Sequence, residues 1–202
     1  MRINRTTRAL GALTLGLALT LSACGNDDTG SDTTSQVSTT EHNDADVTFA
    51  TDMLQHHAQA LSMVDLTEGR TLDPEVQQLA EQIREAQAPE IDTMTAWLTD
   101  WDEEIPDIAS DHDMGDMGES MKGMDSDMPG MMTADEMTAL GKAPDAEFQT
   151  MWLEMMVQHH EGAVEMAKTE TEDGQYKPAV DLADTIISSQ SEEIDTMKDL
   201  LG

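Results

Sequence analysis

The chain has a single cysteine, few aromatic residues and few basic residues, and each scarcity excludes a class of protein or partner. With Cys24 alone among 202 residues, there is no CxxC pair that could hold zinc. Aromatic residues make up 3% of the chain, so aliphatic and methionine side chains must do most of the packing. Only 10 Lys and Arg stand against 42 Asp and Glu, which argues against nucleic acid and anionic lipid surfaces as partners.

Signals for strands and for most enzyme sites are also missing. No segment alternates apolar and polar residues with enrichment in β-branched types, so strands are not expected. No nucleophile–base constellation and no glycine-rich phosphate loop support a hydrolase or a nucleotide-binding protein. We therefore expect an all-α protein whose function is binding and not catalysis.

The N-terminus is typical of an exported protein. Three arginines among the first eight residues precede an uncharged apolar run at 9–21, and Leu21-Ser22-Ala23-Cys24 overlaps its end. This pattern predicts a secretory signal peptide, too short to span a membrane stably. Cys24 stands where the lipobox of bacterial lipoproteins, which this stretch resembles, has its lipidated cysteine. We expect residues 1–23 to be removed and lipid on Cys24 to anchor the protein to the outer face of the cell membrane; an ordinary signal peptide is the alternative.

Removal of the signal peptide makes the chain still more acidic. It leaves 7 Lys and Arg against 42 Asp and Glu, a formal charge of −35 that attracts cations. Residues 24–45 are rich in Asp, Thr, Ser and Asn and predict a disordered tether. The 157 residues that follow are enough for one domain with a moderate core.

The domain contains an internal duplication. Moving residues 46–98 forward by 103 positions places them on 149–201 without a gap, with 16 identities in 53 positions. Each half predicts two amphipathic helices, with Pro74 and Pro178 at the start of the second helix in each and Asp73 as an N-cap. Pro89 should kink or break its helix. We expect a four-helix bundle made of hairpins at 46–101 and 144–202, joined by a Met-rich linker at 102–143.

Both halves carry the motif Met-x-x-His-His on the expected buried face. Thioethers favour Cu(I) or Ag(I), and imidazole suits Cu, Zn, Ni and Fe, so a site that mixes both donors would prefer copper. Core packing of methionine is the alternative, with Gln87, Glu90, Gln190 and Glu193 as hydrogen-bonding or outer-shell partners of the histidines. The candidate metal ligands on the helices are Met53, His56, His57, Met63, Glu90, Met94, Met156, His159, His160, Met166, Glu193 and Met197.

The linker carries a second set of candidate ligands. Three Met-x-x-Met pairs lie among Gly, Asp and Ser, and without apolar neighbours these methionines should be exposed and the stretch mobile, with short helical pieces at most. The pattern resembles the methionine motifs of exported copper-handling proteins and predicts copper or silver binding. A Met-rich flap over the bundle and simple compositional drift are the alternatives. The candidates are His112, Met114, Met117, Met121, Met124, Met128, Met131 and Met132.

The two histidine-centred halves resemble the bacterial family called "domain of unknown function 305" over almost all of residues 46–202. The resemblance implies a ferritin-like four-helix bundle, often exported, with some members linked to copper binding or resistance. Val64 departs from the family's usual alanine, and Pro89 is also unusual. The matching residues are Asp46, Phe49, Met53 to His57, Ala60 and Met63 in the first half, and Asp145, Phe148, Trp152, Met156 to His160, Ala163 and Met166 in the second.

These patterns favour a lipid-anchored protein that binds copper, Cu(I) above all, or silver, for buffering, resistance or delivery, with a copper-handling protein as a candidate partner. We hypothesise that the linker recruits Cu(I) and passes it to the bundle, so that deleting residues 112–132 should slow loading. A di-iron oxidase is less favoured because Met53 and Leu54 replace the glutamate of Glu-x-x-His. Non-covalent haem binding and a purely structural or partner-binding lipoprotein are the remaining alternatives.

Overall fold

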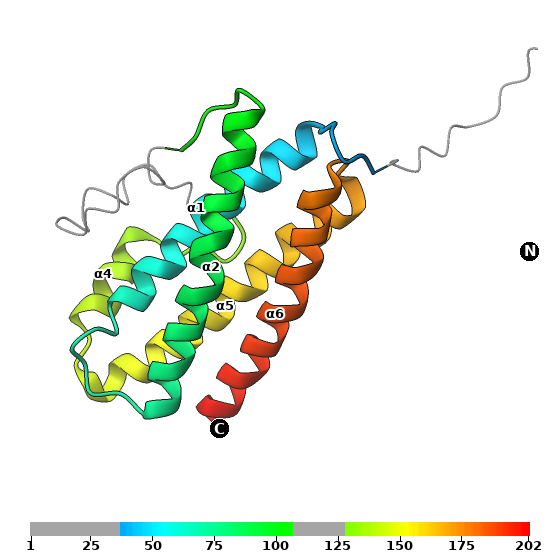
Figure 1. The fold of residues 1–202 in the computed structure, drawn as a ribbon. Helices are drawn as coiled ribbons and strands as arrows, with labels where there is room; N and C mark the ends of the chain where they lie inside the picture. The colour runs from blue at the N-terminus through cyan, green and yellow to red at the C-terminus, as the bar shows by residue number, and fades with distance from the viewer. Residues whose placement is uncertain (1–36, 107–127) are drawn as a thin grey trace, which may run out of the picture. The chain divides into compact units, whose positions relative to one another are not determined.

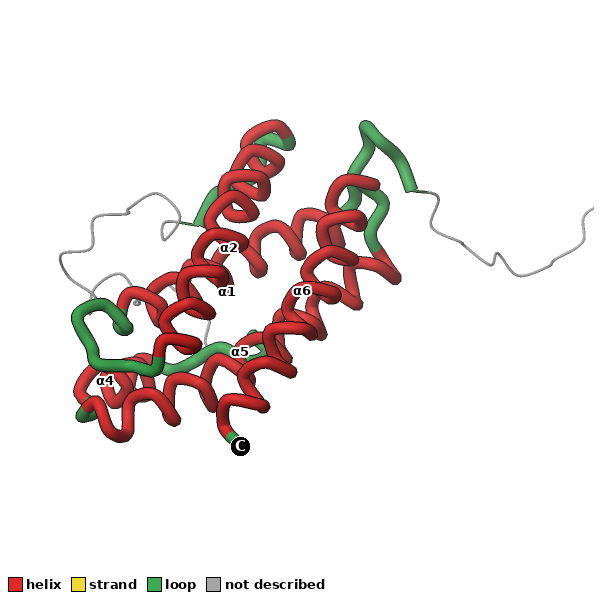
Figure 2. The backbone as a smooth tube through the Cα atoms, turned by 60° about the horizontal axis from the view of Figure 1, so that its bottom comes forward, coloured by secondary structure: helices red, strands yellow, loops and turns green. Residues whose placement is uncertain are grey.

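The computed structural model describes residues 37–106 and 128–202, and this part of the chain is helical without strands (Figures 1 and 2). The predicted all-α class is confirmed. A single isolated bridge pairs Ser38 with Tyr176. The helices are α1 (Asp44–Asp65), α2 (Pro74–Asp100), α4 (Ala134–Lys142), α5 (Asp145–Asp173) and α6 (Lys177–Leu201).

The four long helices form two hairpins, α1 with α2 and α5 with α6, and the hairpins meet mainly through α1 and α5 (Figure 1). The short helix α4 packs against α5. It begins with a capping box in which the Thr133 and Glu136 side chains bond each other's backbone N–H groups, a strong local start signal. The central contact between the hairpins is thus a contact between one helix and its own duplicate.

The core consists of two clusters, and most residues of one cluster have their duplicates, 103 positions away, in the other. Met63 packs in one cluster with Met156 and Met197. Their equivalents in the other half, Met166, Met53 and Met94, belong to the second cluster, where Met166 is only partly buried. The apolar face expected on each helix is therefore buried, and methionine provides much of the packing volume in place of aromatic rings.

The starts of the helices repeat one contact in the two halves. The buried Asp46 carboxylate accepts hydrogen bonds from the backbone N–H groups of Gln175 and Tyr176, where α6 begins. Its counterpart 103 residues later, Gln149, accepts one from the backbone N–H of Asp73, where α2 begins. Each hairpin thereby fixes the turn of the other, which couples the two halves through buried or half-buried polar groups.

One local prediction is wrong, and of the kink or break predicted at Pro89 only the break is excluded. Asp73 stands at the N-cap of α2 but makes no side-chain cap, because its carboxylate accepts from the Gln149 side chain instead. Pro89 does not break α2, which continues from Pro74 to Asp100. The missing donor at Pro89 costs the helix one hydrogen bond, and the packing of Ile91 and Met94 on the partner helices offsets that loss.

The expected tether is docked at its C-terminal end. Ser38 exchanges two backbone hydrogen bonds with Gln175 and Lys177. The ring of His42 stacks on Trp101 at 4.4 Å, and Asn43 caps α1 while its side chain donates to the Asp173 carbonyl. Residues 37–43 are therefore fixed to the turn between α5 and α6, in contrast to the disorder predicted for 24–45, because main-chain pairing and ring stacking supply contacts that composition does not reveal.

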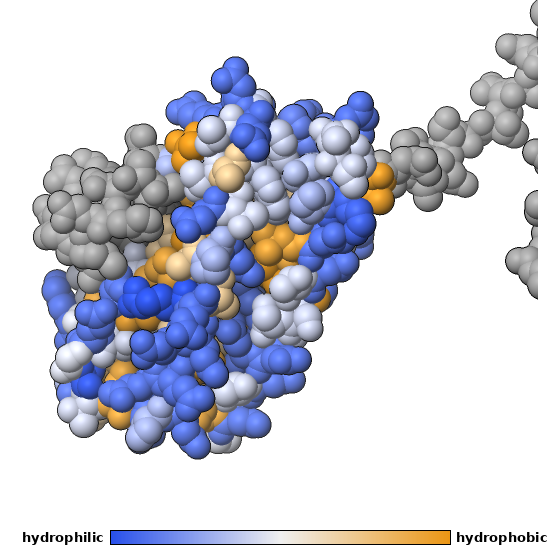
Figure 3. Space-filling view, in the orientation of Figure 1, coloured by the Kyte–Doolittle hydropathy of each residue, from blue (hydrophilic) through white to orange (hydrophobic). Residues whose placement is uncertain are grey.

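The surface is dominated by polar side chains. The face in Figure 3 is mostly hydrophilic, with small hydrophobic areas between charged groups. Among the described residues, Val37 is the one large hydrophobic side chain that is exposed. Within the same ranges no helix has the length and apolar composition needed to cross a membrane.

Candidate metal centre

The contact between α1 and α5 brings two equivalent histidines together. His56 and His159 are both buried, and their ring centroids lie 3.7 Å apart with the planes tilted by 39°. At this separation the rings are in van der Waals contact. There is no space for an ion between the planes, so any shared ion must lie at the ring edges, where the nitrogen atoms are.

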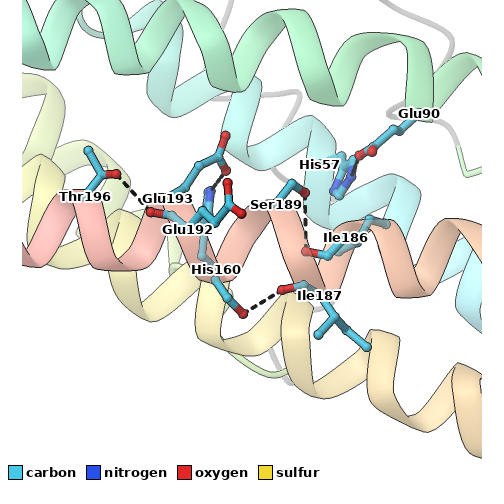
Figure 4. Close-up of polar contacts among 10 residues, drawn as sticks. His57, Glu90, His160, Ile186, Ile187, Ser189, Glu192, Glu193 and Thr196 are labelled. Carbon is cyan, nitrogen blue, oxygen red and sulfur yellow. Dashed lines mark hydrogen bonds and ion pairs between the residues drawn. The ribbon is translucent and has the colours of Figure 1, made fainter.

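The other two histidines each pair with a glutamate of their own hairpin. His57 Nε2 lies 2.7 Å from Glu90 between α1 and α2, and His160 Nε2 lies 2.8 Å from Glu193 between α5 and α6 (Figure 4). Both imidazoles are fully buried, and both carboxylates are partly exposed. A carboxylate can only accept, so Nε2 carries the proton in each pair. The predicted role of Glu90 and Glu193 as partners of the histidines is confirmed.

The end of the Met-rich linker lies directly over the central pair. The Pro129 carbonyl accepts a hydrogen bond of 3.1 Å from His56 Nε2. Three residues on, the Gln59 side chain accepts from the Met132 N–H and donates to the Met132 carbonyl, at 2.7 and 2.8 Å. We call residues 128–132 the linker strap, because its backbone crosses both α1 and α5.

The methionines of the linker strap are buried. Met128, Met131 and Met132 are 9%, 5% and 3% exposed. The prediction that these three are exposed is therefore wrong. The sequence of the linker lacks apolar neighbours, but residues far along the chain provide them, as in the core cluster where Met132 packs with Ala60 and Met156. The Met-rich flap weighed as an alternative describes these three residues better.

Burial keeps the central imidazoles neutral. Desolvation, with the nearby His57 as a smaller cause, lowers the pKa of His56 to about 3. Complete burial, followed by the effect of His56, holds the pKa of His159 well below its ordinary value. Both rings are therefore uncharged at neutral pH. Each has one N–H donor and one nitrogen lone pair, which is the form that binds metal.

Several polar atoms of this layer have no partner. They are Nδ1 of His56, His57 and His160, both nitrogens of His159, both amide atoms of Gln87 and the amide oxygen of Gln190. Gln87 is 2% exposed and bonds none of the histidines, so its predicted hydrogen-bonding role is not observed. Buried polar groups without partners are costly, and a bound ion or water would remove this cost.

The four imidazoles do not converge on one point. Within residues 37–106 and 128–202, no group of three or more His, Cys, Asp and Glu side chains is close enough to hold a metal ion. The arrangement is a central pair, His56 with His159, flanked by two His–Glu pairs. Histidine nitrogens alone can thus offer a low-coordinate site, and further donors must be thioethers.

The structure places the predicted thioethers in both core clusters. Met53, Met63, Met94, Met156 and Met197 are fully buried, and Met166 is partly buried. The remaining candidates lie outside the described residues, namely Cys24, His112, Met114, Met117, Met121 and Met124.

Three residues that position the site were missed by the sequence analysis. Gln59 holds Met132, Pro129 bonds His56, and Gly162 lets the linker strap approach α5 so closely that a side chain there would collide with the Pro129 carbonyl. The duplication carried a signal for two of them, because Gln59 and Gly162 are aligned but differ. A glycine in mid-helix also indicates a close approach.

Comparison with known proteins gives a family match. The model of "Domain of unknown function (DUF305)" matches residues 46–201. A DUF305 protein from Streptomyces coelicolor that is described as secreted is 38% identical, with a TM-score of 0.64 over 78% of this chain and 91% of its own. A DUF305 fragment from Deinococcus radiodurans is 29% identical, with a TM-score of 0.65 over 79% and 97%. Comparison with the curated proteins gave no match.

A third similar structure holds a metal. CopM in its Cu(I)-bound form is 28% identical to this chain, with a TM-score of 0.60 over 77% of this chain and 94% of its own. CopM has also been solved in Cu(II)-bound and silver-bound forms.

Proposed function

The chain belongs to the DUF305 family, and on this basis we propose that it is an exported protein that binds Cu(I), or Ag(I), in the layer of histidines and methionines between its two hairpins. The ion is its cargo, and no turnover is involved. The observation that carries the proposal is the set of buried nitrogen lone pairs without a hydrogen-bond donor. His57 and His160 in particular each present Nδ1 while a glutamate binds Nε2.

The donor chemistry supports a soft ion. The histidines offer neutral imidazoles, and the core around them is rich in thioethers, of which Met53 and Met156 lie one helical turn before His57 and His160. Hard cations prefer several oxygen ligands, carboxylates above all. The carboxylates of the layer are the two glutamates already bonded to histidine, and beside them it offers only the amide oxygens of Gln87 and Gln190. The similarity to CopM, which has Cu(I)-, Cu(II)- and silver-bound forms, supports the same choice.

The N-terminal sequence supports a location outside the cell membrane. A signal peptide with a lipidated Cys24 would hold the domain outside the cell membrane, and the similarity to a DUF305 protein described as secreted supports export. In an oxidising compartment, thioether and imidazole sites persist where thiols would be oxidised. We propose copper buffering, resistance or delivery as the role, with a copper-handling protein as the candidate partner.

The methionine segment is proposed to recruit Cu(I) for the bundle. The deletion that tests this step should end before Met128, because Met128, Met131 and Met132 belong to the core and removing them would disturb the fold. Deletion of residues 112–127 is expected to slow loading of Cu(I) and to leave the thermal unfolding of the bundle unchanged. Equal loading rates in the deletion and the parent would defeat this step alone.

The decisive experiment is anaerobic competition for Cu(I) between the mature domain and a chromophoric chelator. The parent should withdraw Cu(I) from the chelator, and the variant with His56, His57, His159 and His160 all replaced by glutamine should lose most of that capacity. His42→Gln is the matched control, since this histidine stacks on Trp101 away from the centre. Optical spectra test the alternatives, because oxo-bridged iron bands would indicate a di-iron enzyme and a Soret band would indicate haem.

A further inference from the structure

The linker strap breaks the equivalence of the two halves at one histidine. His57 and His160 have the same partner, a glutamate of their own hairpin. His56 has a partner on Nε2, the Pro129 carbonyl, whereas both nitrogens of its duplicate His159 are without one. The strap therefore gives His56 a well-formed hydrogen bond that His159 does not have.

From this contact we infer that Pro129 is a positioning residue, whose carbonyl fixes the tautomer of His56 so that the ion binds at Nδ1 of this histidine. A carbonyl oxygen can only accept, so Nε2 of a neutral His56 must carry the hydrogen and Nδ1 keeps the lone pair. Nδ1 is buried and has no donor near it. The inference rests on the proposed function, because it assigns the ligand atom of the same site.

The strap is held in place by contacts that leave the carbonyl little freedom. Gly130 has a φ of 75°, and a Cβ atom there would lie 2.6 Å from the Gln158 carbonyl oxygen. A Cβ atom on Gly162 would collide with the Pro129 carbonyl and lie 2.8 Å from the Gly130 Cα atom. Gln59 holds Met132 from the α1 side through two hydrogen bonds. Backbone therefore packs on backbone next to the Pro129–His56 bond.

His159 has the complementary property. Its ring is buried and neutral, and neither nitrogen makes a hydrogen bond of accepted geometry. A poorly aligned contact with the His56 backbone is its one hydrogen-bonding contact among the described residues, and it holds the tautomer less firmly than the Pro129 carbonyl holds that of His56. The strap thus gives the central pair one oriented ligand and one adjustable ligand. An oriented first ligand lowers the entropic cost of binding, and outer-shell partners of this kind are worth about 10-fold to 100-fold in metal affinity.

The test uses two variants that move the strap from opposite sides, Gly162→Ala on α5 and Gly130→Ala on the strap. Each has a matched control. Gly141→Ala is also a glycine in a helix, but its Cβ would meet only the Leu66 side chain at 3.5 Å. Gly69→Ala has a similar positive φ of 73°, but its Cβ would meet nothing within 4 Å. The two controls separate helix propensity and backbone strain from displacement of Pro129.

Two readouts are needed, the nitrogen chemical shifts of the His56 imidazole by NMR and the Cu(I) affinity by chelator competition. We expect the parent and both controls to show His56 protonated at Nε2. Both test variants should show a mixture of tautomers and bind Cu(I) about 10-fold or more weakly. Circular dichroism of all four variants verifies that the helices are intact.

An unchanged tautomer in both test variants would overturn the inference, and so would a changed tautomer with unchanged Cu(I) affinity. Failure of the parent to take Cu(I) from the chelator is a different result. It defeats the proposed function itself, whereas the tautomer is measured without metal and is reported in either case.

Discussion

The carboxyl group of Glu170 interacts with that of Asp46 in the interior, beside the turn between α5 and α6. Glu170 is 1% exposed, and neither of its carboxyl oxygens has a hydrogen-bond donor among the described residues. Burial without a donor, beside a second acidic group, favours the protonated form of Glu170. Burial, followed by the interaction with Asp46 and its charge, raises the pKa of Glu170 to about 9.

This pair predicts a loss of stability as pH rises from about 4.5 to about 9. The unfolded chain releases the Glu170 proton near its ordinary pKa of 4.5, but the folded chain keeps it up to about pH 9, so stability falls as pH rises through that window. The slope is at most about 1.4 kcal/mol per pH unit. In Glu170→Gln a neutral amide is buried beside Asp46 without this penalty, and the variant should gain stability over the parent between about pH 6 and pH 9. Urea unfolding measures the difference.

The exposed Glu172, on the same helix, supplies the control. Glu172→Gln should follow the parent at every pH, because its side chain is in solvent. Parallel stability profiles for the parent and Glu170→Gln would show that Glu170 is ionised in the folded protein.

The central histidines predict the opposite change, a stability that falls as pH falls. In the unfolded chain His56 and His159 bind protons near their ordinary pKa of 6.5. In the folded chain both pKa values are lowered, to about 3 for His56, so both rings stay neutral at lower pH. The metal-free protein should therefore lose stability as pH falls below about 6.5. Thermal unfolding between about pH 5 and pH 7, where carboxylates stay largely ionised, should show this slope. The double variant His56→Gln, His159→Gln should lose it and His42→Gln should keep it. A double variant that retains the full slope would contradict neutral central rings.

The glutamates that hold His57 and His160 predict equal effects in the two halves. Glu90→Gln and Glu193→Gln keep an acceptor near Nε2 but remove the charge that makes the imidazole a stronger base. Each should weaken Cu(I) binding by about 10-fold. Chelator competition measures the loss, and Glu85→Gln, on the exposed face of α2, is the control. A loss in one half alone would mean that only one of the flanking pairs serves the ion.

If the buried thioethers bind the ion, replacing them should change Cu(I) affinity much more than stability. Met53→Leu and Met156→Leu keep volume and apolar character, so each should cost less than about 1.5 kcal/mol of unfolding free energy. Both should nevertheless weaken Cu(I) binding and leave weaker Zn(II) binding unchanged, since only the soft ion favours sulfur. Met137→Leu is a control in the same cluster as Met156. If the three variants bind Cu(I) alike, the methionines of the motif are core residues only.

Much of the fold could be predicted from periodicity and duplication. The apolar face that contains Met53, His57 and Ala60 is buried, and its copy on α5 is buried in the same way. The His–Glu pairs were also within reach, since His57 and Glu90 lie on the buried faces of adjacent antiparallel helices and recur with equal spacing. These features depend on the spacing of nearby residues, which can be read from the sequence alone.

The missed features depend on contacts between distant segments. Pro129 bonds His56 across 73 residues, and Gln59 bonds Met132 across the same separation. No periodic pattern indicates where an irregular segment will lie. Glu170 was missed because a glutamate near a helix end usually faces solvent, and only the docking of Asp46 and the turn at Gly174 bury it.

The meeting of α1 with its own duplicate has the geometry of an isologous interface. His56 contacts its equivalent, His159. Met63 packs in the same cluster as Met156, and their equivalents Met166 and Met53 pack together in the other cluster. A dimer of one hairpin about a rotation axis would have the same arrangement, with identical donors on either side of the axis. In a single chain one segment connects the two hairpins, and it contacts the two equivalent histidines differently. If the fused molecule binds an ion as proposed, it can hold that ion off the axis, which two identical subunits could do only by breaking their own symmetry.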